Sequence, residues 1–314
     1  MKLAMIFPGQ GSQTVGMGRE LADQYSQSKA VFDEVDDALG EKLSELIFDG
    51  SQEVLTLTTN AQPALMAVSI AALKALESTG FSLAKQVTYV AGHSLGEYSA
   101  LCAAGALSIS DTARLLRIRG EAMQAAVPVG KGAMAAIIGL ERDVVEAICK
   151  QCAGANCCQI ANDNGGGQLV ISGSRQEVEN AAAMASEKGA KRALLLPVSA
   201  PFHSALMQPA ADAMRQALDK ATLNTPVVPL IANVLATPIT AADEIRNRLV
   251  EQVTGQVRWQ ETIEFMAENG ITHTLETGAG KVLTGLGRRI SRDIKGLAVG
   301  SPGDIEKTLE ALPQ

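Results

Sequence analysis

The sequence predicts an α/β protein: a parallel sheet covered by helices on both faces, carrying an inserted βαββαβ subdomain of the ferredoxin type. Short apolar strands alternate with longer helical patterns, which is typical of a parallel sheet. Hydrophobic residues make up 46% of the chain but aromatic residues only 3%. Such a small-residue core suits helices packed on a sheet better than a sandwich or barrel. With 314 residues, the chain has the length of one large domain or two ordinary ones.

The first part of the chain reads as repeated strand–helix units. A glycine-rich loop over 8–13 follows the first strand, and the second strand runs into the loop 92–96. Gln62-Pro63 is expected near the start of a helix, where the missing N–H of proline costs no hydrogen bond. The expected strands are 2–7 and 87–91, and the expected helices are 17–38, 62–78, one after 96, and 110–126.

Residues 132–196 have a different rhythm, in the order strand, helix, strand, strand, helix, strand. This order is that of a ferredoxin-like unit, so we expect a small subdomain over 129–197 inserted in a large domain formed by 1–128 and 198–314. Within it, the expected strands are 133–139, 157–162, 168–173 and 191–196, and the helices 141–152 and 174–188. After it, helices are expected at 204–220, 241–251 and 259–269, a strand at 272–276, and a last strand and helix after 294.

Composition and charge exclude several classes of function. The net charge is −7, whereas a generic nucleic-acid binder is basic. No apolar run reaches about 18 residues, and the N-terminus lacks the pattern of a signal peptide, so we expect a cytoplasmic protein without membrane spans.

The five cysteines fit a reducing compartment. Cys149 and Cys152 form a CxxC, but no histidine is near it, and Cys157 and Cys158 would point to opposite faces of a strand, so no metal is expected.

Two glycine clusters resemble nucleotide-binding loops only superficially. Thr14 stands where the dinucleotide fingerprint that starts at Gly9 requires its third glycine. Val282 follows Lys281 where a phosphate-binding loop requires serine or threonine. We therefore expect no nucleotide cofactor.

The most informative motif is Gly92-His93-Ser94-Leu95-Gly96, which matches G-x-S-x-G between a strand and an Ala-rich helix. In such a nucleophile elbow, the glycines let strand and helix approach, and the serine sits on a sharp, strained turn. Its hydroxyl then lies at a helix N-terminus, which favours developing negative charge. The pattern predicts that Ser94 is a nucleophile; the alternative is a simple glycine-lined turn.

A nucleophilic serine needs a base, and the chain has only three histidines. His93 is adjacent to Ser94, and neighbours on a sharp turn diverge. His273 lies in an alternating, strand-like segment and reads as structural. His203 lies in a loop just before a helix, where catalytic residues are common, so it is the predicted base.

Arg119 falls in the middle of the apolar face of the expected helix 110–126. A buried guanidinium must be paired, because an isolated buried charge costs several kcal/mol. One interpretation is an internal ion pair with an aspartate or glutamate. The other is a pocket arginine that binds an anionic ligand, and a carboxylate fits best because two parallel hydrogen bonds can hold it.

These residues together resemble the malonyl-CoA:acyl carrier protein transacylases of dissociated (type II) bacterial fatty acid synthesis. The resemblance covers nearly the whole chain and implies a hydrolase-like α/β domain with a ferredoxin-like insert. The segments that carry it, in order, are Phe7-Pro8-Gly9-Gln10-Gly11-Ser12-Gln13, Gln62-Pro63, Gly92-His93-Ser94-Leu95-Gly96-Glu97, Arg119, Gly132-Ala133-Met134-Ala135-Ala136, Phe202-His203-Ser204 and Gly278-Ala279-Gly280-Lys281.

The resemblance implies a role for each matching position. Ser94 would be the nucleophile and His203 its base, with the backbone N–H groups of Gln10 and Leu95 as the oxyanion hole. Arg119 would hold the malonyl carboxylate, and the main-chain carbonyl of Gln252 would replace a triad acid. The Gln62 and Phe202 side chains would line the substrate site. Some bacterial members have serine in place of Phe202; in related polyketide acyltransferases, phenylalanine there accompanies malonyl specificity.

The implied reaction moves a malonyl group from malonyl-CoA to an acyl carrier protein, with no cofactor and no nucleic acid or membrane partner. We expect a monomer.

Acyl carrier proteins are acidic and this chain is also acidic, so docking requires a local basic patch. Two clusters are candidates: Lys191 and Arg192 with Lys188, and Arg288 and Arg289 with Lys281. The alternative is that both are ordinary solvated faces. A polyketide-pathway acyltransferase and a serine esterase or thioesterase remain the alternatives; a simple esterase would have no use for a buried Arg119.

Overall fold

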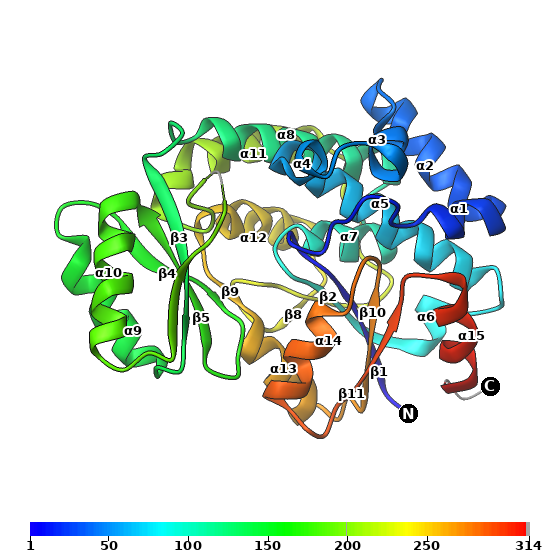
Figure 1. The fold of residues 1–314 in the computed structure, drawn as a ribbon. Coiled ribbons are helices and arrows are strands. Elements are labelled where there is room, and N and C mark those ends of the chain that lie inside the picture. Colours follow the sequence, from blue (N-terminus) through cyan, green and yellow to red (C-terminus); the bar gives the residue numbers. More distant parts are fainter. Residues whose placement is uncertain (199, 312–314) are drawn as a thin grey trace.

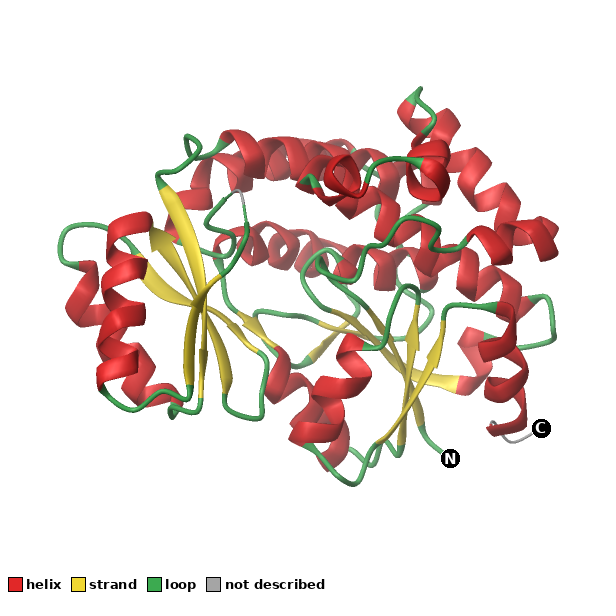
Figure 2. Cartoon of the chain, viewed as in Figure 1, coloured by secondary structure: helices red, strands yellow, loops and turns green. Residues whose placement is uncertain are grey.

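The computed structural model describes residues 1–198 and 200–311, which are organised around two β-sheets (Figures 1 and 2). Residues 199 and 312–314, which the expected large domain includes, lie outside this description. The larger sheet has six strands in the order β11-β10-β1-β2-β7-β8, all parallel except for the last pair. Its strands are β1 (Leu3–Phe7), β2 (Val87–Gly92), β7 (Leu230–Ile231), β8 (Pro238–Ile239), β10 (His273–Thr277) and β11 (Lys295–Val299).

Alternate residues of β1 face two different hydrophobic clusters, which explains why the whole strand is buried. Leu3, Met5 and Phe7 belong to a cluster shared with the long helix α5 (Thr58–Glu77). Ala4 and Ile6 pack in another cluster with α13 (Trp259–Glu268) and α14 (Val282–Ile290). Both faces of the larger sheet are therefore covered, as expected for parallel strands.

The helices outside the smaller sheet's unit are α1 (Arg19–Gln24), α2 (Ser26–Leu39), α3 (Leu43–Asp49), α4 (Gln52–Thr56), α5 (Thr58–Glu77), α6 (Leu83–Gln86), α7 (Gly96–Ala103), α8 (Ile109–Ala125), α11 (Gln208–Lys220), α12 (Ala242–Thr254), α13 (Trp259–Glu268), α14 (Val282–Ile290) and α15 (Pro302–Ala311), with a 3-10 turn η1 (Ala205–Met207).

The smaller sheet, on the left in Figure 1, has the order β6-β3-β5-β4-β9. Its first four strands are antiparallel neighbours in the ferredoxin order, and α9 (Arg142–Ala153) and α10 (Arg175–Glu187) pack together beside them. The strands are β3 (Gly132–Ile138), β4 (Cys158–Asp163), β5 (Gln168–Ser174), β6 (Arg192–Leu195) and β9 (Val257–Arg258). Sequence analysis thus predicted the fold class, a mainly parallel sheet plus a ferredoxin-like unit, and this is confirmed.

The smaller sheet also recruits a strand that sequence analysis missed. β9 lies outside the expected insert and pairs parallel to β4. Together with the two-residue strands β7 and β8, it is too short to produce a recognisable hydrophobic pattern. The division into 1–128 with 198–314 and 129–197 stays a prediction.

Several predicted helix boundaries were wrong. Helix α5 begins at Thr58, so Pro63 lies inside it rather than in its first turn. The expected helix 17–38 is two helices that meet at Tyr25, whose backbone is extended. The predicted start at 204 is a 3-10 turn before α11. None of the helices in the described ranges combines the length and apolarity needed to cross a bilayer.

Three loops meet at one edge of the larger sheet. Because β10, β1 and β2 are adjacent and parallel, the segments that follow their carboxyl ends lie together, in the place where open α/β sheets bind ligands. These segments are 8–13, 93–95 and 278–281. The first two segments, with residues of α14 (Val282–Ile290) that follow the third, line a cavity that the smaller sheet closes from the other side.

Candidate active site

Ser94 sits on the sharp turn between β2 and α7, with a left-handed backbone at φ 54°. A non-glycine residue in this region is strained and is held there by its surroundings. The two flanking glycines are obligatory, because a Cβ on Gly92 would lie 1.9 Å from the backbone of Gly96, and one on Gly96 would lie 2.3 Å from the Phe7 carbonyl oxygen. The geometry is that of the nucleophile elbow predicted from the motif.

Asn233 holds this turn in place from the loop after β7. Its Oδ1 accepts a hydrogen bond of 2.8 Å from the backbone N–H of Ser94, and its Nδ2 donates to the Gly92 carbonyl at 2.6 Å. The side chain is 1% exposed. Sequence analysis missed Asn233; the available signal was a polar residue directly after the apolar segment 230–232.

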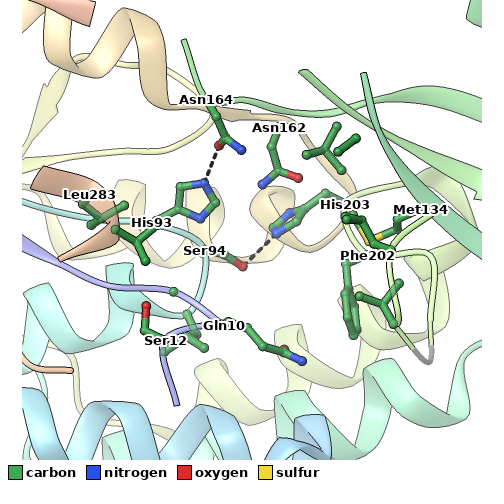
Figure 3. A pocket seen from close by; sticks show the side chains of 18 of the residues that line it. Gln10, Ser12, His93, Ser94, Met134, Asn162, Asn164, Phe202, His203 and Leu283 are labelled. Carbon is green, nitrogen blue, oxygen red and sulfur yellow. Dashed lines mark hydrogen bonds between the residues drawn. The ribbon is translucent and has the colours of Figure 1, made fainter. Parts of the chain in front are cut away.

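His203 lies next to Ser94, with 2.7 Å between its Nε2 and the serine Oγ (Figure 3). Its Nδ1 lies 2.9 Å from the Gln252 carbonyl oxygen and 3.1 Å from that of Gly255. Carbonyl oxygens only accept hydrogen bonds, so Nδ1 carries the proton and Nε2 is free to accept the serine proton. Burial, reinforced by the charge of Arg119, lowers the pKa of His203 to about 3, so the imidazole is neutral at physiological pH.

The other two histidines are not placed to act on Ser94. His93 directs its Nε2 to Asn164 Oδ1 at 2.9 Å, away from the serine hydroxyl (Figure 3). Burial lowers its pKa. His273 begins β10 and does not line the cavity. His93 therefore links the elbow to the end of β4, where Asn164 follows the strand.

Arg119 is 1% exposed and points to the elbow from α8. Its Nη1 donates to Gln62 Oε1 at 2.7 Å, and its Nη2 donates to Gln252 Oε1 at 2.8 Å and to Ser94 Oγ at 3.2 Å. Within residues 1–198 and 200–311, no carboxylate forms an ion pair with it. The neutral amides hold the guanidinium without neutralising it, so it can still bind an anion.

Ser94, His203 and Arg119 open into a cavity of about 480 Å³ between the two sheets. Phe202 lies on an apolar wall with Met134 and Val170 from the smaller sheet, and Gln10, Leu95 and Gln62 also line the cavity. In the part of the chain that the structure describes, neither the Gln10 N–H nor the Leu95 N–H donates to a protein acceptor. No group of three or more metal-ligating side chains occurs among those residues.

The predicted basic clusters lie on two sides of the turn at Gly165–Gly167. Lys191 packs against Gly139, whose N–H donates to the Gly167 carbonyl, while Arg289 packs against Gly166 from α14. Arg289 also lines the cavity, which brings this cluster to its mouth. Arg192 on β6 and Arg288 on α14 are exposed beside them.

The chain is similar to known acyltransferases along nearly its whole length. The family described as "Acyl transferase domain" matches residues 4–294. The malonyl CoA-acyl carrier protein transacylase of Bacillus subtilis (strain 168) is 47% identical over all of this chain and 98% of its own length. The chain belongs to the malonyl CoA-acyl carrier protein transacylase family. The corresponding protein of Escherichia coli (strain K12) is 44% identical over 98% of this chain and 99% of its own.

Solved structures of transacylase family members share the whole fold. An acyl-carrier-protein S-malonyltransferase from Bartonella henselae has a TM-score of 0.97 and 61% identity, over 99% of both chains. A malonyl-transacylase solved in complex with its type II PKS acyl-carrier protein has a TM-score of 0.96 and 41% identity, over 99% of this chain and 100% of that one. The resemblance stated from the sequence motifs is therefore confirmed.

Proposed function

We propose that this protein transfers the malonyl group of malonyl-CoA to the phosphopantetheine thiol of an acyl carrier protein, through a malonyl ester on Ser94, and so supplies fatty acid elongation. The observation that carries the proposal is the position of Arg119, whose Nη2 lies 3.2 Å from the nucleophile Oγ. A malonyl carboxylate is separated from its thioester carbonyl by one methylene carbon. A malonyl group esterified to Ser94 would thus have its free carboxylate within reach of the Arg119 guanidinium.

In the first half-reaction, Ser94 Oγ attacks the thioester carbonyl while His203 Nε2 removes the hydroxyl proton. The Gln252 carbonyl holds the Nδ1 proton and stabilises the imidazolium that forms. The oxyanion of the tetrahedral intermediate would be bound by the N–H groups of Gln10 and Leu95. Collapse of the intermediate expels CoA, whose sulfur takes the proton from His203, and leaves malonyl-Ser94.

The second half-reaction reverses these roles with a different thiol. His203, again neutral, removes the proton of the carrier's phosphopantetheine thiol, and the thiolate attacks the Ser94 ester. Collapse breaks the bond to Ser94 Oγ, which recovers its proton from His203. A thioester is consumed and a thioester is formed, so the overall equilibrium is near balance.

The test is incubation with malonyl-CoA and phosphopantetheinylated carrier protein, followed by mass measurement of the carrier. Malonyl-carrier is expected, and its formation should require the enzyme. Accumulation of free malonate without malonyl-carrier would instead identify a thioesterase. Transfer to a polyketide carrier is the second candidate, since one similar solved structure holds a type II PKS carrier. Parallel assays with fatty acid and polyketide carriers distinguish the two pathways.

The buried position of His203 predicts an unusual pH dependence. Formation of malonyl-Ser94 from malonyl-CoA should stay near its plateau from pH 7 down to about pH 5, because the neutral imidazole persists far below the usual histidine pKa of 6.5. His203 takes up a proton on unfolding at any pH between its folded pKa of about 3 and its unfolded pKa of 6.5. The free energy of unfolding should therefore decline as pH falls below about 6.5. Rapid-quench kinetics with intact-protein mass detection measures the reaction, and an acid limb near pH 6.5 would contradict the assignment.

The two basic clusters predict a local docking surface for the acidic carrier. Arg192→Glu combined with Arg289→Glu should raise the KM for carrier about three- to tenfold, by removing attraction at the cavity mouth. Malonylation of Ser94 by malonyl-CoA should change much less. The wild-type carrier KM should rise with salt, because exposed charges are screened beyond about 8 Å. Arg215→Glu, an exposed reversal on α11 outside the cavity, is the control. If the carrier KM responds neither to the double charge reversal at Arg192 and Arg289 nor to salt, the docking surface lies elsewhere.

We also propose that the protein acts as a monomer in the cytoplasm. The three side chains that the mechanism uses, Ser94, His203 and Arg119, already lie within hydrogen-bond distance in a single chain. The five cysteines are all free thiols, which fits a reducing compartment.

A further inference from the structure

Glu97 is a buried carboxyl group behind the candidate site that the proposed mechanism does not use. It lies in the first turn of α7, three residues after the nucleophile, and is 1% exposed. Its Oε2 accepts a hydrogen bond from Gln252 Nε2. Its Oε1 is buried without a hydrogen-bond partner among the described residues. An ionised carboxylate in such a place would be poorly solvated, so the site favours the neutral acid.

The structure separates this carboxyl group from Arg119 by one amide side chain. Gln252 presents Oε1 to the guanidinium and Nε2 to both Glu97 and the Ser94 carbonyl. Because the guanidinium only donates and the carbonyl only accepts, this amide orientation is fixed. Glu97 is thus close enough to act on the charge of Arg119, yet it forms no ion pair with it in the described chain.

We propose that Glu97 is a specificity-determining residue: its carboxyl group stays protonated, so that the single positive charge of Arg119 remains available to the carboxylate of the malonyl group. This inference rests on the proposed malonyl transfer. Two carboxylates would otherwise compete for one guanidinium in a water-poor site, where like charges repel strongly. A neutral acyl group, such as acetyl, makes no such demand on Arg119.

The electrostatics around Glu97 support this arrangement. Burial raises its pKa to about 8, against the opposing effects of Gln252, the Asn233 backbone and the charge of Arg119. Tyr98, on the same helix, stays neutral because burial raises its pKa far above the physiological range. Among the described residues, Arg119 is the charged group that acts on Glu97, beside the neutral residues Gln252 and Asn233, while Glu97 in turn acts on the neighbouring Tyr98.

The proposal predicts that the rate of malonylation of Ser94 falls at alkaline pH, while the rate of acetylation changes little. In the wild-type protein, kcat/KM for malonylation of Ser94 by malonyl-CoA should fall about tenfold between pH 7 and pH 9, as Glu97 ionises. Acetylation by acetyl-CoA should fall less than about twofold over the same range. Measuring only this first half-reaction removes the ionisation of the acceptor thiol from the profile.

The test compares wild type with Glu97→Gln, which keeps an acceptor for Gln252 but cannot ionise. In this variant, kcat/KM for malonylation should differ less than about twofold between pH 7 and pH 9. Glu97→Asp, which can still ionise, should retain the decline. An equal decline in Glu97→Gln, or an equal decline for acetyl and malonyl in the wild type, would overturn the proposal. The wild-type comparison requires no variant and decides even if a variant fails to fold. Malonylation of Ser94 at pH 7 tests the proposed function separately, whatever the profile shows.

Discussion

Ser94→Ala should abolish formation of the malonyl-enzyme and lower turnover by about a millionfold, the effect of removing a nucleophile that acts together with its base. The substitution removes one oxygen at a turn whose shape is set by Gly92, Gly96 and the brace from Asn233. The fold should therefore persist, and the thermal midpoint should stay close to that of the wild type. Intact-protein mass after incubation with malonyl-CoA is the measurement.

The control for this experiment is Ser186→Ala, which removes an exposed hydroxyl group on α10. It should acquire one malonyl group as the wild type does, and peptide mapping should locate that group on Ser94. A malonyl adduct that survives in the Ser94→Ala protein would disprove the nucleophile assignment.

Arg119→Ala should reduce malonyl transfer by about a thousandfold, corresponding to about 4 kcal/mol for an unpaired charge in a buried site. The truncation also leaves the Gln62 and Gln252 amide oxygens without their donor. Acetyl transfer should fall much less, because acetyl carries no carboxylate, and acetyl-CoA could become the better substrate. The ratio of kcat/KM for the two thioesters is the decisive quantity.

Arg114→Ala is the matched control for Arg119, since it lies on the same helix with a largely exposed side chain that pairs with Asp111. Its ratio of malonyl to acetyl transfer should equal that of the wild type. Equal losses of malonyl and acetyl transfer in the Arg119→Ala protein would mean that Arg119 supports the structure rather than selects the substrate.

The parts of the site that sequence analysis predicted are those with a strong local pattern. The G-x-S-x-G segment between a strand and a helix predicted the elbow at Ser94, and the structure has that geometry. The helical periodicity around Arg119 predicted a buried guanidinium, and it is 1% exposed. Elimination among three histidines selected His203, whose Nε2 lies 2.7 Å from the serine.

Other parts could not be predicted because they depend on contacts between distant segments. The Gln252 carbonyl is a backbone group, so no side-chain pattern marks it, and only the resemblance pointed there. Asn233 is 139 residues from Ser94 in the chain. Glu97 reads locally as an acidic residue that favours a helix N-terminus. Its burial comes from the strands and helices packed around α7, and its partner Gln252 comes from α12. The short strands likewise depend on distant partners: β7 pairs with β2, β9 pairs with β4, and β8 pairs with β7 in turn.

The central claim is that malonyl-Ser94 lies on the path from malonyl-CoA to the carrier. The most direct test is a single-turnover experiment, in which malonyl-enzyme freed of malonyl-CoA is mixed with phosphopantetheinylated carrier and quenched at short times. We predict that the malonyl group passes from Ser94 to the carrier at least as fast as steady-state turnover, with little release of free malonate. Transfer slower than turnover, or loss of the group to water, would contradict the account.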